Sequence, residues 1–250
     1  MIYNKSMEFT QDILEYYDEL FPVSQSQKDF FFALVEGKNP PPRVLSIGCG
    51  GSNFEHILSR KGCDVTGIDD NSLLLEAASR RRRIPGVTIR FFKMSMLEMA
   101  RFLAEGFYSV VYCINNRISG VHDDILMKKF FFDCKKLLAK NGKLILQLPN
   151  YLFFTNEPVC KLPSTQSIRA KLHTKIFTSS DGEKTLLQQV ETSSGKLIAV
   201  TDHEKLIPIT TKDIEELAMA TGFTKVEFFN DYDKSEFKPK ESKNLIAILS

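Results

Sequence analysis

Val44-Leu45-Ser46-Ile47-Gly48-Cys49-Gly50-Gly51-Ser52 joins an apolar strand to a glycine-rich loop, and residues 54–60 follow with the periodicity of a helix. In doubly wound α/β folds, this first loop is where a nucleotide-like ligand crosses the carboxyl edge of the sheet. Glycine suits the loop because a Cβ atom would block the ligand and because the turn can require a positive φ. The segment therefore predicts a ligand site at the end of the first strand.

An acidic residue lies where such a ligand would need one. Residues 64–68 predict a second strand, and Asp69 follows it directly, 21 positions after Gly48. A carboxylate at that place can accept both hydroxyl hydrogens of an adenosine ribose. Because the glycine loop and the acid occur together, we favour this role over that of a simple helix cap. The third glycine of a dinucleotide fingerprint is replaced by Asn53, which disfavours a cofactor that contains a pyrophosphate.

Strands and helices alternate along most of the chain. The expected strands are residues 44–47, 64–68, 87–91, 108–113, 143–148, 225–230 and 244–249. The expected helices are residues 54–60, 72–83, 96–104, 122–140 and 211–221. This order predicts an α/β fold of the doubly wound type, with a mostly parallel seven-stranded sheet and helices on both of its faces.

Two segments depart from this alternation. Residues 1–42 predict an N-terminal helical cap, which ends where three prolines, Pro40 to Pro42, stop the helix. The main domain is predicted over residues 43–250. Within it, residues 149–208 contain short β-like runs separated by glycines, and we expect them to form an antiparallel insertion that covers the site.

The composition is that of an ordinary globular protein, with 250 residues, 43% of them hydrophobic, and a formal net charge of +2. So balanced a charge does not by itself suggest a nucleic-acid or membrane surface. The five cysteines are odd in number and have no C-x-x-C spacing, so we expect neither a disulfide framework nor a cysteine zinc site. No metal is expected, since His56, His122, His173 and His203 lack ligand spacing and are interpreted as surface or capping residues. We expect a cytoplasmic protein, because no apolar run reaches about 18 residues and the start does not resemble a signal peptide.

Several motifs resemble those of the class I S-adenosylmethionine-dependent methyltransferases, in the order in which that family has them. Residues 44–52 are similar to its first motif, usually V-L-D-I-G-C-G-T-G, and residues 67–69 to the acid motif of its second strand. Further similarity to its third- and fourth-strand motifs, its K-P-G-G-x-L stretch and its A-G-F-x-x-V pattern lies in residues 91–96, 112–116, 140–146 and 220–226. The resemblance covers roughly residues 43–250.

The resemblance implies a methyltransferase with S-adenosylmethionine as its cofactor. It implies that the cofactor is contacted by Ser46, Gly48, Cys49, Gly50, Asp69, Asp70, Ser95, Met96, Ile114 and Asn115. Two of these residues depart from the family pattern. Ser46 stands where an acid often helps to hold the methionine part, and Ser95 stands where an aspartate commonly contacts the adenine amino group. Either the affinity is modest or other groups compensate for these two serines.

We expect the methyl acceptor to bind over the ends of the fourth and fifth strands, as the switch-point rule suggests. Its pocket is expected to be lined by Tyr17, Asn116, Arg117, Asn150 and Tyr151. Within the family, the resemblance is to small-molecule methyltransferases of the glycine N-methyltransferase-like kind. A small molecule with a nitrogen or oxygen nucleophile is therefore the expected partner. No catalytic residue is assigned, because a general base is needed only if the nucleophile arrives protonated, and the oligomeric state is left open.

Three other functions are weighed against this one. A non-catalytic protein that binds S-adenosylmethionine would account for Ser46 and Ser95. An RNA or protein methyltransferase would share the same core, although no basic, aromatic-rich nucleic-acid module is visible. A NAD-dependent reductase would share the glycine loop, but Asn53 and the later motifs disfavour it.

Overall fold

The main sheet of the computed structural model has seven strands in the order β11-β12-β5-β4-β1-β2-β3. The structure describes residues 11–81, 88–154 and 157–250. β1 pairs in parallel with β2 and β4, whereas β12 is antiparallel to both β5 and β11. The strands are β1 (Arg43–Ile47), β2 (Asp64–Asp69), β3 (Ile89–Lys93), β4 (Tyr108–Cys113), β5 (Leu138–Pro149), β11 (Val226–Phe229) and β12 (Asn244–Leu249). This arrangement confirms the predicted seven-stranded, mostly parallel sheet.

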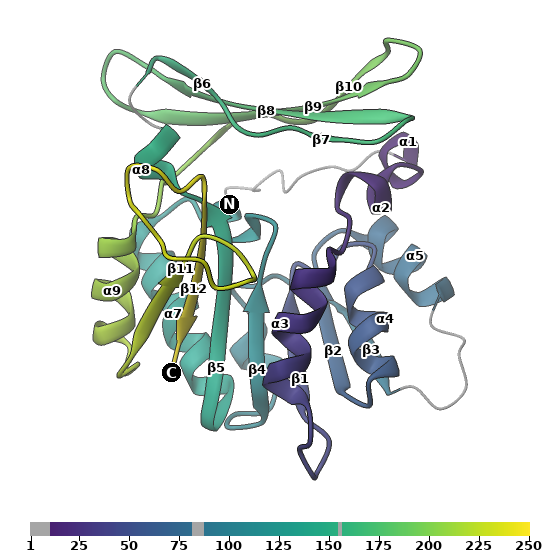
Figure 1. Cartoon of the computed structure of the whole chain (residues 1–250), viewed down its shortest axis with the longest axis vertical. Coiled ribbons are helices and arrows are strands. Elements are labelled where there is room, and N and C mark those ends of the chain that lie inside the picture. Colours follow the sequence, from purple (N-terminus) through teal and green to yellow (C-terminus); the bar gives the residue numbers. More distant parts are fainter. Residues whose placement is uncertain (1–10, 82–87, 155–156) are drawn as a thin grey trace.

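Helices cover both faces of this sheet (Figure 1). They are α3 (Gln25–Val35), α4 (Asn53–Arg60), α5 (Ser72–Arg81), α6 (Met99–Phe102), α7 (Asp124–Leu137) and α9 (Thr211–Ala220). Val44 of β1 packs in one hydrophobic cluster with α3 and α4, and its neighbour Leu45 packs in another with α7 and α9. Since successive side chains of a strand point to opposite faces, the sheet is a buried central layer. In the described part of the chain, no helix has the length and apolar character needed to cross a membrane.

A local capping signal sets the start of α3, whereas strand pairing sets the end of α7. Ser24 caps α3 by accepting a hydrogen bond from the backbone N–H of Gln27 at 3.1 Å, at the capping-box spacing of these two residues. α7 ends earlier than the sequence predicts, at Leu137, because Leu138 already pairs with Tyr108 of β4. Pairing between β4 and β5 thus overrides the helical periodicity of the residues that follow α7.

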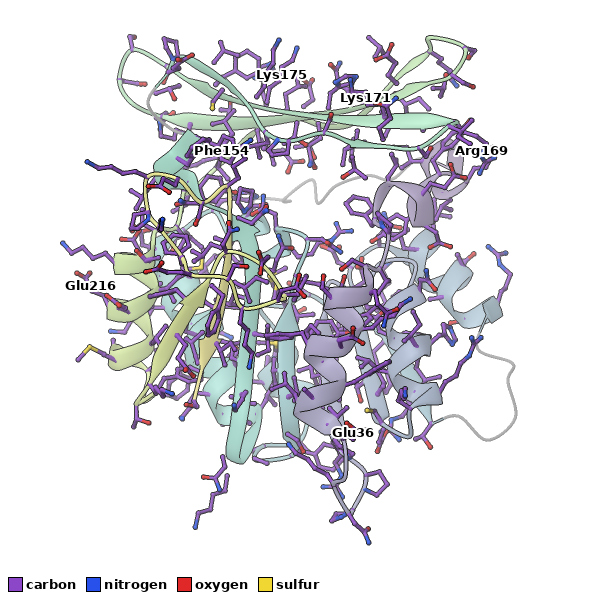
Figure 2. All side chains as sticks on the ribbon, in the orientation of Figure 1. Glu36, Phe154, Arg169, Lys171, Lys175 and Glu216 are labelled. Atoms are coloured by element: carbon purple, nitrogen blue, oxygen red, sulfur yellow. The ribbon has the colours of Figure 1, made fainter. Side chains whose placement is uncertain are left out.

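A second sheet, which we call the lid, lies across the carboxyl ends of the central strands (Figure 1). Its antiparallel strands are β6 (Val159–Lys161), β7 (Thr165–Gln166), β8 (Ala170–Thr178), β9 (Lys184–Thr192) and β10 (Leu197–Lys205). In β8, Leu172 and Ile176 are buried on the face toward the main domain, while Lys171 and Lys175 stand on the outer face (Figure 2). The lid confirms the predicted antiparallel insertion, although β6, β7 and α8 (Tyr151–Phe154) have no counterpart in the expectation.

Two short helices, α1 (Gln11–Leu14) and α2 (Tyr17–Leu20), lie between the lid and α5, and we call them the cap helices. Tyr17 is buried in one hydrophobic cluster with Leu74 of α5 and Leu172 of the lid. The cap helices therefore close one side of the space between the lid and the main sheet, directly above the loop that follows β1.

Candidate functional site

The glycine-rich loop after β1 is fastened to the end of β2. The backbone N–H groups of Gly48 and Cys49 both donate to the carbonyl oxygen of Ile68, at 2.9 and 3.0 Å. The backbone N–H of Gly50 donates to Oδ2 of Asp69 at 2.8 Å. Gly48 and Gly50 have φ angles of +71° and +52°, in the left-handed region that favours glycine. The glycine-rich loop is thus held against the acid that follows the second strand.

Asp69 is fixed through both of its oxygens. Its side chain is only 6% exposed, and Oδ1 accepts a hydrogen bond from the backbone N–H of Asn71 at 2.9 Å, while Oδ2 accepts from Gly50. An ionised carboxylate offers about four acceptor positions, so each oxygen can still accept from a ligand hydroxyl. The geometry required of a ribose-binding acid is therefore present at this place.

Two cavities meet at Gly48, with volumes of about 130 Å³ and about 30 Å³. Nine of the ten residues predicted to contact the cofactor line one cavity or the other. Besides Gly48, those of the larger cavity are Asp69, Asp70, Ser95 and Met96. Those of the smaller cavity are Ser46, Cys49, Ile114 and Asn115. The fold thus gathers around one loop a set of residues that are widely separated in the sequence.

The side chains of Tyr17 and Arg117 cover the glycine loop. Nη2 of Arg117, at the start of the short helix η1 (Arg117–Gly120), donates to the hydroxyl oxygen of Tyr17 at 2.7 Å. A Cβ atom placed on Gly50 would lie 1.8 Å from that hydroxyl oxygen, and one placed on Gly48 would lie 2.8 Å from Cγ of Arg117. Burial raises the pKa of Tyr17 to about 12, so its hydroxyl keeps its proton at neutral pH.

The Tyr17–Arg117 contact lies at the junction of the two cavities, since Tyr17 borders the smaller one and Arg117 the larger one. Pockets for small molecules typically measure about 300–1,000 Å³, more than both cavities together. A ligand that fills both cavities therefore requires this contact to shift. The shift involves the cap helices, because α2 carries Tyr17.

Arg169 of the lid holds the cap helices in place (Figure 2). Its Nη1 donates to Oε1 of Glu15, and its Nε donates to Oε1 of Glu19, both at 2.8 Å. All three side chains are partly exposed to solvent. Pairs of this kind typically contribute about 0.2–1 kcal/mol each, enough to bias the position of a short helix but not the stability of the domain.

We therefore expect Arg169→Ala to speed ligand entry and to leave the fold intact. The association rate constant of S-adenosylhomocysteine, measured by stopped-flow fluorescence or surface plasmon resonance, should rise about 3- to 10-fold as the cap helices open more often. Lys171→Ala, on the outer face of β8 and two residues further along the chain, is the matched control and should change nothing. Equal rates for wild type and Arg169→Ala would contradict a gating role for the cap helices.

The structure brings together two of the residues expected to line the acceptor pocket and sets another apart. The hydroxyl of Tyr151 donates to Oδ1 of Asn116 at 2.9 Å, which links the ends of β5 and β4. Asn150 is 2% exposed, and its Nδ2 donates to the carbonyl oxygens of Pro239 and Ser242 at 2.8 and 2.7 Å. Its amide N–H groups therefore hold the segment before β12 in position.

Two residues at the cavities have no signal in the sequence. Glu55 of α4 borders the smaller cavity, although it lies in a stretch that reads as an ordinary amphipathic helix. His122, interpreted from the sequence as a surface or capping residue, lines the larger cavity with Glu204 of the lid. Nδ1 of His122 is buried and has no hydrogen-bond partner among the described residues, and burial lowers the pKa of His122. A neutral imidazole at this place can accept a proton.

Comparison with known proteins assigns residues 44–142 to a family model described as a methyltransferase domain. A protein of Geobacillus sp. strain WCH70, provisionally named a methyltransferase, is 25% identical over 67% of this chain and 63% of its own length. A ubiquinone biosynthesis O-methyltransferase of Erwinia tasmaniensis is 30% identical over 43% of this chain and 42% of its own length. The chain thus spans less than two thirds of each of these relatives.

Solved structures match nearly the whole chain at low sequence identity. The CcbJ methyltransferase from Streptomyces caelestis superposes with a TM-score of 0.77 at 16% identity, over 95% of both chains. An S-adenosylmethionine-dependent methyltransferase from Clostridium acetobutylicum gives a TM-score of 0.75 at 14% identity, over 96% of this chain and 97% of the other. The sugar N-methyltransferase KedS8 from Streptoalloteichus sp. gives 0.63 at 12% identity, over 99% and 96%. Because the lid and the cap helices lie inside these spans, the match extends to the complete architecture.

Proposed function

We propose that this chain, which belongs to the class I S-adenosylmethionine-dependent methyltransferases, transfers a methyl group from S-adenosylmethionine to a small-molecule acceptor. The observation that carries the proposal is the pair of cavities that meet at Gly48 and are lined by nine of the ten expected cofactor contacts. The residues present fit the cofactor, since an acid, a glycine loop and apolar walls stand where its parts would need them.

Each cavity suits one part of the cofactor. Asp69 borders the larger cavity and can accept hydrogen bonds from ribose hydroxyls, while Met96 supplies an apolar surface for a flat base. Ile114 and Asn115 border the smaller cavity, beside the glycine loop, and suit the amino-acid part. S-adenosylmethionine, when bound, supplies a methyl group on a positively charged sulfur, which is already a strong electrophile.

The chain itself contributes alignment and the exclusion of water. The lid closes over the carboxyl edge of the sheet, and the Asn116–Tyr151 hydrogen bond fixes two polar side chains at that edge. Good alignment of two reactants can lower a barrier by roughly 7–11 kcal/mol.

A small-molecule acceptor is supported by the enclosed site and by the relatives. The lid contributes Leu186, Glu204 and Lys205 to the wall of the larger cavity, which restricts access for a macromolecule. The names of two similar proteins refer to ubiquinone biosynthesis and to a sugar N-methyltransferase. All five cysteines are free thiols, which supports the further proposal of a reducing, cytoplasmic compartment.

The experiment that tests the proposal is a calorimetric titration with S-adenosylmethionine and S-adenosylhomocysteine. It is followed by a screen of nitrogen and oxygen nucleophiles with S-adenosylmethionine labelled in its methyl group. Micromolar binding together with transfer of label to a small molecule supports the proposal. Binding without transfer to any acceptor class would favour a non-catalytic binding protein. Thermal protection by NAD but not by S-adenosylmethionine would favour a reductase.

We expect Asn116→Ala and Tyr151→Phe to lower kcat/KM for the acceptor identified in that screen, by about 10- to 100-fold for the first variant and less for the second. The reason is that each substitution breaks the hydrogen bond that orients the other side chain. The affinity for S-adenosylhomocysteine serves as the internal control and should change less than about threefold. Unchanged turnover in both variants would place the acceptor elsewhere.

A further inference from the structure

Glu55 is a carboxylate buried under the glycine loop. It lies in the first turn of α4 and is 3% exposed. The hydroxyl of Ser46 donates to its Oε1 at 2.6 Å, and the hydroxyl of Tyr112 donates to the same oxygen at 2.7 Å. These three side chains tie α4 to β1 and β4, and both hydrogen bonds use only one of the two carboxylate oxygens. The second oxygen, Oε2, keeps its acceptor capacity.

In the described part of the chain, no positively charged side chain forms an ion pair with this carboxylate. Among the described residues no ion pair includes Glu55, and the groups that act on it are its two hydroxyl donors, its own backbone and the negative charge of Asp69. Burying an unpaired carboxylate is costly, and burial accordingly raises the pKa of Glu55. A cation bound beside Glu55 would offset this cost and would favour the charged form of the carboxylate.

The smaller cavity has the character of a cation site. The described residues that line it include two acidic side chains, Asp18 and Glu55, and no lysine, arginine or histidine. The larger cavity is lined by side chains of both signs, and it contains Arg117, whose guanidinium is a group that can bind a carboxylate through two hydrogen bonds. A ligand with an ammonium group on one side and a carboxylate on the other matches this distribution of charge.

We propose that Glu55, held by Ser46 and Tyr112, is the residue that binds the α-ammonium group of the amino-acid part of the cofactor. This inference rests on the proposed function. It explains how the chain can carry a neutral serine at position 46, since Glu55 reaches the same place from the following helix and takes the Ser46 hydroxyl as a donor. Relative to the family pattern, the negative charge thus comes from position 55 instead of position 46, and the site keeps it.

The test compares two ligands that differ only in the amino-acid part. S-adenosylhomocysteine carries the ammonium group, whereas 5′-methylthioadenosine has the same adenosine and a thioether but no amino acid. Glu55→Gln keeps the shape and both acceptor positions for the hydroxyls. We expect this variant to bind S-adenosylhomocysteine about 10- to 100-fold more weakly in calorimetry, and 5′-methylthioadenosine within about threefold of wild type.

Two further variants make the result specific. Asp133→Asn removes another buried carboxylate, which is 4% exposed and paired with Lys129 on α7, and should change the affinity for neither ligand. The double variant Ser46→Asp, Glu55→Gln restores one negative charge to the site, now at position 46. It should recover most of the lost affinity for S-adenosylhomocysteine. A purely structural role of Glu55 would not give this selective loss and recovery.

Thermal melts separate binding from folding. Because burial raises the pKa of Glu55, its contribution to stability is fully present below the unfolded pKa of about 4.3 and is lost as the pH rises through the higher folded pKa. The charged and titratable groups around it are Asp69, Tyr17, Tyr112 and Cys49. We therefore expect Glu55→Gln to melt no lower than wild type at pH 7.5. If it did not fold, Tyr112→Phe would replace it, with a severalfold selective loss for S-adenosylhomocysteine.

The outcomes distinguish this inference from the function on which it rests. Wild type that binds neither S-adenosylmethionine nor S-adenosylhomocysteine would overturn both. Wild type that binds, combined with a Glu55→Gln variant that loses both ligands equally or loses neither, would overturn the role of Glu55 alone. A selective loss of S-adenosylhomocysteine, with recovery in the double variant, supports it.

Discussion

Replacing Gly50 by alanine is expected to abolish measurable binding of S-adenosylmethionine, a loss of at least about 100-fold. The new Cβ would lie 1.8 Å from the hydroxyl oxygen and 2.5 Å from Cζ of Tyr17, so the cap helix could not close over the loop. At a φ of +52°, an alanine also costs about 1–2 kcal/mol of backbone strain. The distortion would pull the Gly50 N–H away from Asp69, which positions the loop. Calorimetry with S-adenosylhomocysteine is the direct measurement.

Gly62 provides the matched control for this substitution. Its φ of +90° is also in the left-handed region, but a Cβ added there would have no heavy atom of the described structure within 4 Å. Gly62→Ala should therefore show only the backbone cost, as a modest fall in melting temperature, with cofactor affinity unchanged. If the two variants bound S-adenosylhomocysteine alike, the glycine loop would not be in contact with the ligand.

Asp69→Asn is expected to lower the affinity for S-adenosylmethionine by at least about 100-fold, because hydrogen bonds to a charged group contribute about 1.5–3 kcal/mol each and we propose that two ribose hydroxyls donate to this carboxylate. The side chain that replaces it has one acceptor oxygen instead of two, and its amide N–H₂ would face either the Gly50 N–H or the Asn71 N–H. The loop and the ligand would then compete for a single oxygen.

Asp64, at the opposite end of the same strand, is the control for the loss of charge. It forms an ion pair with Arg90 on β3, far along the strand from the glycine loop. Asp64→Asn should leave the affinity for S-adenosylmethionine within about twofold of wild type. If Asp69→Asn bound S-adenosylmethionine as well as Asp64→Asn does, the ribose would not bind at Asp69. The assignment of the larger cavity to the ribose and the base would then be weakened.

The sequence alone could identify the glycine-rich loop, the acid and the order of the strands along the chain, because each of these depends on residues that are close together in the sequence. A positive φ at Gly48 and Gly50 is favoured by residues without a Cβ atom, and the run from Val44 to Ile47 is apolar except for Ser46, as in a strand buried on both faces. The lid was also within reach of sequence reasoning, since alternating residues such as Leu172 and Ile176 show the two-residue period of an antiparallel strand.

Only the tertiary structure decided which of these elements place side chains next to one another at the site. Tyr17 and Arg117 are 100 positions apart and meet over the glycine loop, and Glu55 and Tyr112 are 57 positions apart and meet beneath it. No periodicity or spacing in the sequence predicts these pairs, because they form only when β4 pairs with β1 and the cap helices pack under the lid. The sequence therefore determined that a glycine-rich loop and an acid stand at the ends of β1 and β2, where we propose the ligand site. The packing of distant segments decided how the charge of that site is distributed, because a buried charge acts on whatever is near it in space and not on what is near it in the chain.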